Sequence, residues 1–339
     1  MIIVLKPGIS KKDESAVLQE IRKLGYTPHV MRGVARTVIG AIGDELSHAN
    51  LNVLSAQFPK AVESVMPIQK RYKLVSREAH PANSTIRAGK QIIGGQKFQV
   101  MAGPCSVESE TQLLKTAEAV KKAGATILRG GAFKPRTSPY EFQGLGEKGL
   151  KLLAKARKET GLAVITELLS ENHAEMVAGY ADILQIGARN AQNFQLLIAA
   201  AKTGKPVLLK RGLAMKIEEW LLAGEYVLAN ENPNLMFCER GIRTFETYTR
   251  NTLDLSTIPI IKHESHCPIV IDPSQGAGRA DLVATMCKGA VAMGADALLI
   301  EVHPNPAEAW SDGAQQLTLD GFAKLMKELR PFIAAAGWK

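Results

Sequence analysis

The stretch CPIVIDPSQGAGRADL, Cys267 to Leu282, holds a buried strand, a polar turn and the start of a helix. Its apolar residues run directly into Asp272, and the chain then turns through Gln275 and two glycines to Arg279. A short, continuous apolar run of this kind is typical of a strand that is buried on both faces. The same order of apolar run, polar turn and helical pattern recurs from Phe98 to the end of the chain.

Eight such units are present. Their strands are FQVMAGPC, TILRGG, AVITEL, ILQIGA, PVLLKRG, LMFCERG, PIVIDPS and ALLIEVHP. The intervening stretches have helical spacing, and those ending at Gly161 and Gly204 stop at the residue type that favours a helix C-terminus. Eight units over about 240 residues predict a (β/α)8 TIM barrel, of class α/β, over 98–339. A doubly wound sheet is disfavoured, because no G-x-G-x-x-G follows the first strand.

The first 67 residues have a different pattern, strand, helix, two strands, helix, strand, with the second helix over 44–56. Val17, Leu18, Ile21 and Leu24 give the first helix one apolar face. This order predicts a small α+β ferredoxin-like domain over 1–67, with a packing or regulatory role. Residues 68–97 are predicted to be a linker, followed by a hairpin that caps one end of the barrel.

The composition is that of a globular protein, with 46% hydrophobic and 22% charged residues among 339. The net charge of +9 comes without a long basic run, which argues against a nucleic-acid partner. No apolar run approaches a membrane span, and the N-terminus is too soon polar for a secretory signal. The four cysteines form no C-x-x-C pair, so we expect a cytoplasmic protein.

Charged residues follow the predicted strands. The basic ones are Arg129, Lys134, Arg136, Arg189, Lys210 and Arg240. A barrel gathers its strand ends at one face, where active sites lie. So many cations would repel one another unless a multiply charged anion offsets them. Arg and Lys together are suited to phosphate, so the sequence predicts a site for phosphorylated ligands.

A second set of strand-end residues has the character of metal ligands. Cys105, Glu301 and Asp312 provide one thiolate and two carboxylates, which with a neutral donor would suit Mn, Fe, Co or Zn. Other interpretations stay open: Cys105 as a buried apolar side chain, Asp312 as a cap of the last helix, and Glu301 as the partner of an Arg.

The motifs GPCSVES and KPRTSPYEFQGLGEKGL resemble those of 3-deoxy-D-arabino-heptulosonate 7-phosphate (DAHP) synthase, in the short-chain subgroup related to 3-deoxy-octulosonate 8-phosphate synthase. The resemblance continues through GARNAQNFQLL, KPVLLKRG, CERGIRTFETYTRNTLD, EVHP and SDGAQQL. It implies a transferase that condenses phosphoenolpyruvate with erythrose 4-phosphate and water to give DAHP and phosphate, the first step of the shikimate pathway to aromatic amino acids. The residues Pro-Arg-Thr in the second motif are those of DAHP synthases, whereas the octulosonate enzymes have a different, Asn-containing loop, so the resemblance favours the four-carbon sugar as substrate.

The resemblance also implies residue roles. Phosphoenolpyruvate would be held by Arg129, Lys134, Ala188, Arg189, Lys210 and Arg240, of which Lys134, Arg189, Lys210 and Arg240 would be catalytic. The sugar phosphate would be bound by Lys134, Pro135, Arg136, Thr137 and Ser138. Lys134 would protonate the new alkoxide, and a divalent metal would be held by Cys105, Glu301, Asp312 and a residue after the seventh strand.

At that fourth ligand position Gln275 stands where the metal-using family has His. Three interpretations follow: Gln275 ligates weakly through its oxygen, another group or water takes the place, or the activity is altered or lost. His303, His266 and His263 are the imidazoles we expect nearby.

Two alternatives to this synthase stay open: octulosonate synthase activity, and a non-catalytic barrel that senses a phosphorylated metabolite. The N-terminal domain resembles the regulatory extension of some family members. That resemblance implies tyrosine or phenylalanine as an effector and a homo-oligomer, a tetramer in the family.

Overall fold

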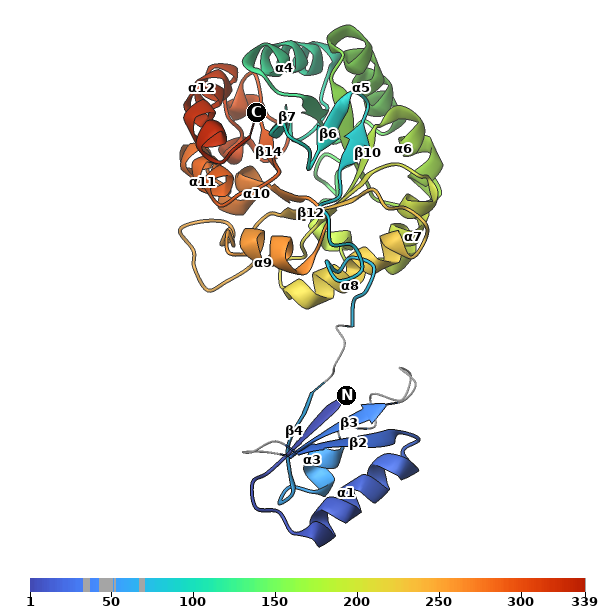
Figure 1. The fold of residues 1–339 in the computed structure, drawn as a ribbon. Helices are drawn as coiled ribbons and strands as arrows, with labels where there is room; N and C mark the ends of the chain where they lie inside the picture. Colours follow the sequence, from blue (N-terminus) through green and yellow to red (C-terminus); the bar gives the residue numbers. More distant parts are fainter. Residues whose placement is uncertain (33–36, 43–50, 52, 67–70, 339) are drawn as a thin grey trace. The chain divides into compact units, whose positions relative to one another are not determined.

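The computed structural model describes residues 1–32, 37–42, 51, 53–66 and 71–338. These residues form two compact units, Met1–Arg71 and Tyr72–Lys339 (Figure 1). The predicted helix over 44–56 is described only in part, since 44–50 and 52 lie outside these residues, as do residues 68–70 of the predicted linker. Among the described residues, no helix is long and apolar enough to cross a membrane.

The first unit has the predicted ferredoxin-like fold. Its elements are β1 (Ile2–Leu5), α1 (Lys11–Lys23), β2 (Thr27–Arg32), β3 (Thr37–Ile42), α3 (Leu54–Gln57) and β4 (Val62–Met66). The strands form one sheet in the order β2-β3-β1-β4. Ser10 accepts a hydrogen bond from the N–H of Asp13 and so caps α1, whose Val17 and Ile21 are buried against Ile3 of β1 and its neighbours.

The segment that opens the second unit contacts the barrel. The Glu225 carboxylate accepts the backbone N–H groups of Lys73, Leu74 and Val75 at 2.6 to 3.1 Å, and the side chain of Val75 is buried. A hairpin of β5 (Ile86–Ala88) and β6 (Gln91–Ile93) follows. Its apolar residues pack against inward-facing residues of the barrel strands, so the hairpin covers the amino end of the barrel.

The second unit is the predicted closed barrel of eight parallel strands (Figure 1). The strands are β7 (Gln99–Gly103), β8 (Ile127–Arg129), β9 (Ala163–Leu168), β10 (Ile183–Ile186), β11 (Val207–Lys210), β12 (Leu235–Glu239), β13 (Ile269–Ile271) and β14 (Ala297–Glu301). Every residue of these strands is buried, which explains why their apolar runs do not alternate.

Helices surround the strands (Figure 1). They are α4 (Glu110–Ala123), α5 (Glu147–Thr160), α6 (Ala174–Tyr180), α7 (Phe194–Lys202), α8 (Ile217–Leu228), α9 (Thr257–Glu264), α11 (Ala280–Ala292) and α12 (Leu319–Ala335). A short extra helix, α10 (Pro273–Ala277), follows β13 directly. Gly161 ends α5 in the left-handed conformation, at φ +75°, as the sequence predicted. The polar strand ends therefore meet at the carboxyl face of the barrel.

Candidate active site

A cavity of about 300 Å³ opens at this face. It is lined by Lys134, Pro135, Arg136, Thr137, Glu141, Glu167, Gln185, Gly187, Ala188, Arg189, Lys210, Arg240, Arg250, Gln275 and Asp312. Six of these side chains are basic and three are acidic. The cavity thus has an excess of positive charge that a multiply charged anion would offset.

Most of the predicted anion-binding residues meet in this cavity. Arg129 and Ser138 do not line it: Arg129 is buried beside a smaller cavity that shares Glu167 and Gln185 with the main one. Ser138 lies in the same loop as Thr137, and its hydroxyl accepts the N–H of Tyr140 at 3.3 Å. The structure therefore brings the predicted cations together at one end of the barrel.

Two of the cations are paired with buried carboxylates. Lys210 Nζ lies 2.6 Å from Oδ2 of Asp272. The other carboxylate oxygen, Oδ1, accepts a hydrogen bond from the N–H of Gln275, so Asp272 also caps α10. Arg129 Nη1 lies 2.9 Å from Glu301 Oε1, close enough for an ion pair but without hydrogen-bond alignment. These partners hold the basic groups at the base of the cavity.

Arg240 differs from these two because its partner is neutral. Its Nη2 donates to Oε1 of Gln275 at 3.0 Å, and its Nη1 is buried without a hydrogen-bond partner among the described residues. A buried guanidinium nitrogen of this kind is costly unless an acceptor reaches it. Arg240 therefore has a free donor at the wall of a cationic cavity.

Lys134 contacts one of the three predicted metal ligands Cys105, Glu301 and Asp312, which together are called the metal set. Its Nζ lies 3.0 Å from Cys105 Sγ and 3.2 Å from the Cys105 carbonyl oxygen. Burial opposes the ammonium form, but the nearby acidic groups, which are the Cys105 thiol and the carboxylates of Glu167 and Glu301, outweigh it and raise the pKa of Lys134. An ammonium group with a proton to donate is therefore favoured at this position.

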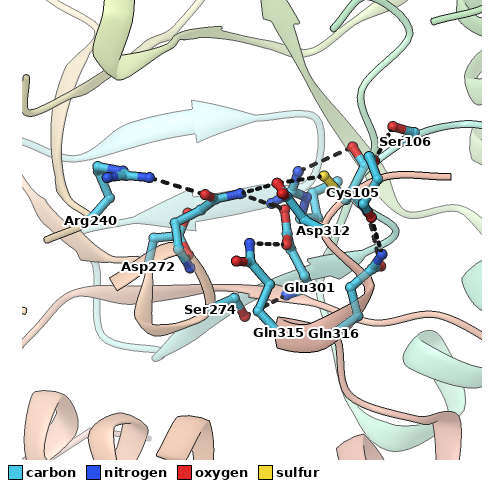
Figure 2. Close-up of polar contacts among 12 residues, drawn as sticks. Cys105, Ser106, Arg240, Asp272, Ser274, Glu301, Asp312, Gln315 and Gln316 are labelled. Carbon is cyan, nitrogen blue, oxygen red and sulfur yellow. Dashed lines mark hydrogen bonds and ion pairs between the residues drawn. The ribbon is translucent and has the colours of Figure 1, made fainter. Parts of the chain in front are cut away.

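Cys105, Glu301 and Asp312 offer ligand atoms that lie within 4.8 Å of one another (Figure 2). Burial, followed by the charge of Glu301, raises the pKa of the Cys105 thiol to about 12, so a metal bound there must displace the thiol proton. Arg250 Nη1 lies 3.0 Å from Asp312 Oδ1, and the charges of Arg250 and Lys134 outweigh burial and lower the pKa of Asp312. One thiol and two carboxylates at this spacing fit a divalent ion of borderline character.

The other interpretations of this set have mixed outcomes. Thr318, not Asp312, caps α12. Glu301 does pair with Arg129, and it also accepts a hydrogen bond from Gln315 Nε2 at 2.6 Å. Cys105 is fully buried, but its sulfur contacts two polar side chains and is not packed as an apolar residue alone.

Gln275 turns its nitrogen to the metal set. Its Nε2 donates to Glu301 Oε1 and to Asp312 Oδ2, both at 3.1 Å, while its oxygen accepts from Arg240. The amide in this orientation does not present its oxygen as a fourth ligand. Gln275 as a fourth ligand through its oxygen therefore stays a prediction, and it requires the amide to turn over from this orientation.

Two of the three histidines are placed differently from expectation. His303 is buried, with Nε2 3.2 Å from Glu108 Oε2. His266 precedes β13 and contacts Ser84 and the carbonyl oxygen of Leu74, so it lies at the amino side of the barrel. His263 is in the last turn of α9, on the same side. The expectation that His266 and His263 lie near the metal set was therefore wrong.

Some residues of the cavity were not predicted as site residues, although two of them, Arg250 and Glu141, stand inside motifs of the resemblance. Arg250 lies in the loop after β12, well beyond the strand end, and Glu141 pairs with Arg136 at 2.7 Å within one loop. Gly187 could have been noticed in the sequence, because it follows the strand β10 directly. In the structure, a Cβ at this residue would lie 2.0 Å from Glu167 Oε1. Its lack of a side chain leaves room for that carboxylate beside the cavity.

Comparison with known proteins gives matches to both units. The DAHP synthetase I family matches residues 74–335, and the DAHP synthase ferredoxin-like domain matches residues 1–70. A phospho-2-dehydro-3-deoxyheptonate aldolase of Thermotoga maritima is 49% identical over 100% of this chain and 99% of its own. A crystal structure of that DAHP synthase has a TM-score of 0.87, covering 100% of this chain and 98% of its own. A 2-dehydro-3-deoxyphosphooctonate aldolase of Caulobacter vibrioides is 33% identical over 74% of this chain and 91% of its own.

Proposed function

The chain belongs to the DAHP synthetase I family, and we propose that it condenses phosphoenolpyruvate with erythrose 4-phosphate and water to give DAHP and inorganic phosphate. It is an enzyme of the first step of the shikimate pathway. The observation that carries this function is the cationic cavity at the carboxyl face of the barrel, where Arg240 has a buried donor without a partner among the described residues.

Binding two phosphorylated substrates is what the charges of this cavity suit. Lys210 and Arg240 at its base, with Arg189 at its more exposed edge, would hold the phosphate and carboxylate of phosphoenolpyruvate. Arg129 and Ala188 would complete this subsite. Because both substrates are anions, neutralising them lets the cavity hold their reacting carbons in contact, which is a large part of the catalysis.

The loop from Lys134 to Ser138 would bind erythrose 4-phosphate. Arg136 and Thr137 line the cavity beside Arg189, whose Nη2 lies 3.5 Å from Thr137 Oγ1. The two proposed subsites are therefore neighbours. The full-length relative at 49% identity bears the heptonate name, whereas the octonate relative at 33% matches only part of this chain, which supports the four-carbon sugar.

The proton needed in the reaction would come from Lys134. As C3 of phosphoenolpyruvate bonds to the aldehyde carbon, the aldehyde oxygen gains negative charge and takes a proton from Nζ of Lys134. C2 becomes electron-poor, water adds there, and the C2–O bond to phosphate then breaks to leave the ketone of DAHP. Of the two protons of that water, one replaces the proton given up by Lys134 and the other leaves with the phosphate. A divalent metal held by Cys105, Glu301 and Asp312 would supply Lewis-acid polarisation of the aldehyde; Mn, Fe, Co and Zn all suit this donor set.

Release of inorganic phosphate tests the function. Purified protein given phosphoenolpyruvate, erythrose 4-phosphate and Mn should release phosphate, and a chelator should reduce the rate. Lys134→Met should lower kcat by about 10² to 10⁴, the usual loss for a general acid, whereas Lys148→Met, at an exposed residue of α5, should not. No release with any divalent metal would refute the synthase and favour a phosphometabolite sensor, and faster release with arabinose 5-phosphate would favour the octulosonate reaction.

Regulation is proposed for the first unit. The match of residues 1–70 to the DAHP synthase ferredoxin-like domain supports a regulatory domain over 1–67 that binds tyrosine or phenylalanine and lowers activity. Deletion of residues 1–67 should abolish the inhibition, and unchanged inhibition would contradict this role. We further propose a cytoplasmic homo-oligomer, a tetramer as the resemblance implies, which sedimentation would test; all four cysteines are free and buried, which agrees with a reducing compartment.

A further inference from the structure

The side-chain amide of Gln275 is held at both ends. Its oxygen accepts from Arg240 Nη2 at 3.0 Å, and its nitrogen donates to one oxygen each of Glu301 and Asp312 at 3.1 Å. The backbone is held as well, since Asp272 accepts the Gln275 N–H at 2.9 Å and Asn251 Nδ2 donates to the Gln275 carbonyl oxygen at 2.9 Å. Gln275 therefore bridges the metal set and the anion subsite from a rigid turn.

Only one orientation of the amide suits these neighbours. A guanidinium group has donors alone, and an ionised carboxylate has acceptors alone. If the amide turned over, its NH2 would face Arg240 and its oxygen would face Glu301 and Asp312. In the protein alone, both of those contacts are repulsive.

Ligation of a metal by Gln275 requires that reversed orientation. A cation between the amide oxygen and the two carboxylates would remove the repulsion on that side. The cost that remains falls on Arg240, because it loses its acceptor for Nη2 while Nη1 already lacks a hydrogen-bond partner among the described residues. A buried guanidinium with neither terminal nitrogen satisfied opposes the metal-ligating orientation.

An anion at Arg240 removes that cost. Phosphate or carboxylate oxygens would accept from both terminal nitrogens of Arg240 and from the NH2 of the reversed amide. We propose that Gln275 is a two-position switch that makes metal and phosphoenolpyruvate bind cooperatively: the anion frees the amide oxygen to become the fourth metal ligand. The proposal rests on the proposed function, since it takes phosphoenolpyruvate as the anion bound by Arg240.

A histidine in this place would act differently. An imidazole ligates a metal through a ring nitrogen. It has no oxygen that accepts a hydrogen bond from Arg240, so no such bond must break before the metal is bound. The metal affinity of a Gln275→His variant should therefore depend much less on the anion. Gln275→Ala removes both the amide that must turn and the ligand, so it isolates the simple attraction between a nearby metal and anion.

The test is a titration with Co²⁺, read by the thiolate-to-cobalt absorption of Cys105, with and without saturating phosphoenolpyruvate. For the unmodified protein we expect phosphoenolpyruvate to lower the Kd for Co²⁺ about 5-fold to 150-fold, the range of typical coupling between sites. Gln275→His should bind Co²⁺ more tightly without the anion, and both variants should show a clearly smaller effect of phosphoenolpyruvate. By reciprocity, calorimetry should find phosphoenolpyruvate bound more tightly, by the same factor, when Co²⁺ is present.

An equal effect of phosphoenolpyruvate in the unmodified protein and in Gln275→Ala would overturn the switch, because charge proximity alone would then explain the coupling. The switch would also be overturned if, without phosphoenolpyruvate, the unmodified protein bound Co²⁺ as tightly as Gln275→His does. Failure of phosphoenolpyruvate to bind in calorimetry, with or without Co²⁺, would instead remove the proposed function and the switch together. The tryptophan fluorescence of each variant checks that it is folded.

Discussion

Replacement of Lys210 by methionine should destabilise the barrel strongly, because it leaves a buried charge without its partner. The Lys210 ammonium lies 2.6 Å from Oδ2 of Asp272, and the two side chains are 7% and 0% exposed. At an effective dielectric constant of about 20, two unit charges at this separation attract by about 6 kcal/mol. Methionine preserves much of the side-chain volume, so the change removes mainly the charge.

The net loss is smaller than the attraction, because removal of Lys210 also removes the cost of burying its own ammonium group. Asp272 keeps one hydrogen bond, from the N–H of Gln275 at 2.9 Å. Breaking a buried pair by removing one partner typically costs about 3 to 5 kcal/mol. We expect a loss in this range for the free energy of unfolding of the barrel.

Lys288→Met is a matched control. Lys288 Nζ lies 2.6 Å from Glu328 Oε2, the same separation, but its side chain and that of Glu328 are 29% and 33% exposed. Water screens the attraction in such a partly exposed pair, so its loss should cost much less than the loss of a buried pair. The two variants therefore differ mainly in the burial of the pair that is broken.

The assay is urea unfolding followed by tryptophan fluorescence. The three tryptophans, Trp220, Trp310 and Trp338, all lie in the Tyr72–Lys339 unit, so the signal reports the barrel and not the N-terminal unit. Fits with a common slope give the difference in the free energy of unfolding for each variant. If Lys210→Met lost no more stability than Lys288→Met, burial would not be what makes the loss of one partner costly.

Three further changes test other parts of the structure. Gly187→Ala places a methyl group 2.0 Å from Glu167 Oε1, the end of a flexible side chain that must move aside, so we expect a loss of no more than about 1 kcal/mol in urea unfolding, and a much larger loss would show that this carboxylate is held in place. Glu225→Ala removes the acceptor of three backbone N–H groups, so hydrogen exchange at Lys73 to Val75 should become faster; equal rates would show that the Glu225 carboxylate is not needed to protect these N–H groups. Burial lowers the pKa of His266 below its ordinary 6.5, so the unfolded chain binds a proton at a higher pH than the folded barrel does. The barrel should therefore lose stability as the pH falls below about 6.5. His266→Gln should lose less stability over the same pH range, and an identical pH profile would refute this role of His266.

The barrel could be predicted from the sequence because its signals are local. Each strand is a short apolar run, since both of its faces are buried, and most of the runs are followed by charged residues before a helical pattern. The parallel topology then requires those ends to meet at one face. For this reason the cations from Lys134 to Arg240 could be assigned to one site before their distances were known.

The side of the barrel on which a loop residue lies was less predictable. His266 stands just before a strand and His303 just after one, so the barrel places them at opposite ends. Arg250, which contacts Asp312, lies well beyond its strand in a long loop. The path of such a loop depends on packing against distant residues, which periodicity does not describe.

Local sequence alone thus determined the two folds and the end of the barrel that collects charge, because burial on both faces of a strand restricts residue type directly. Only the tertiary structure decided what each charged group faces. Arg129 pairs with Glu301, far away along the chain, and the amide of Gln275 is oriented by Arg240 on one side and two carboxylates on the other. These contacts join side chains from different parts of the barrel, and their geometry exists only once the barrel has closed.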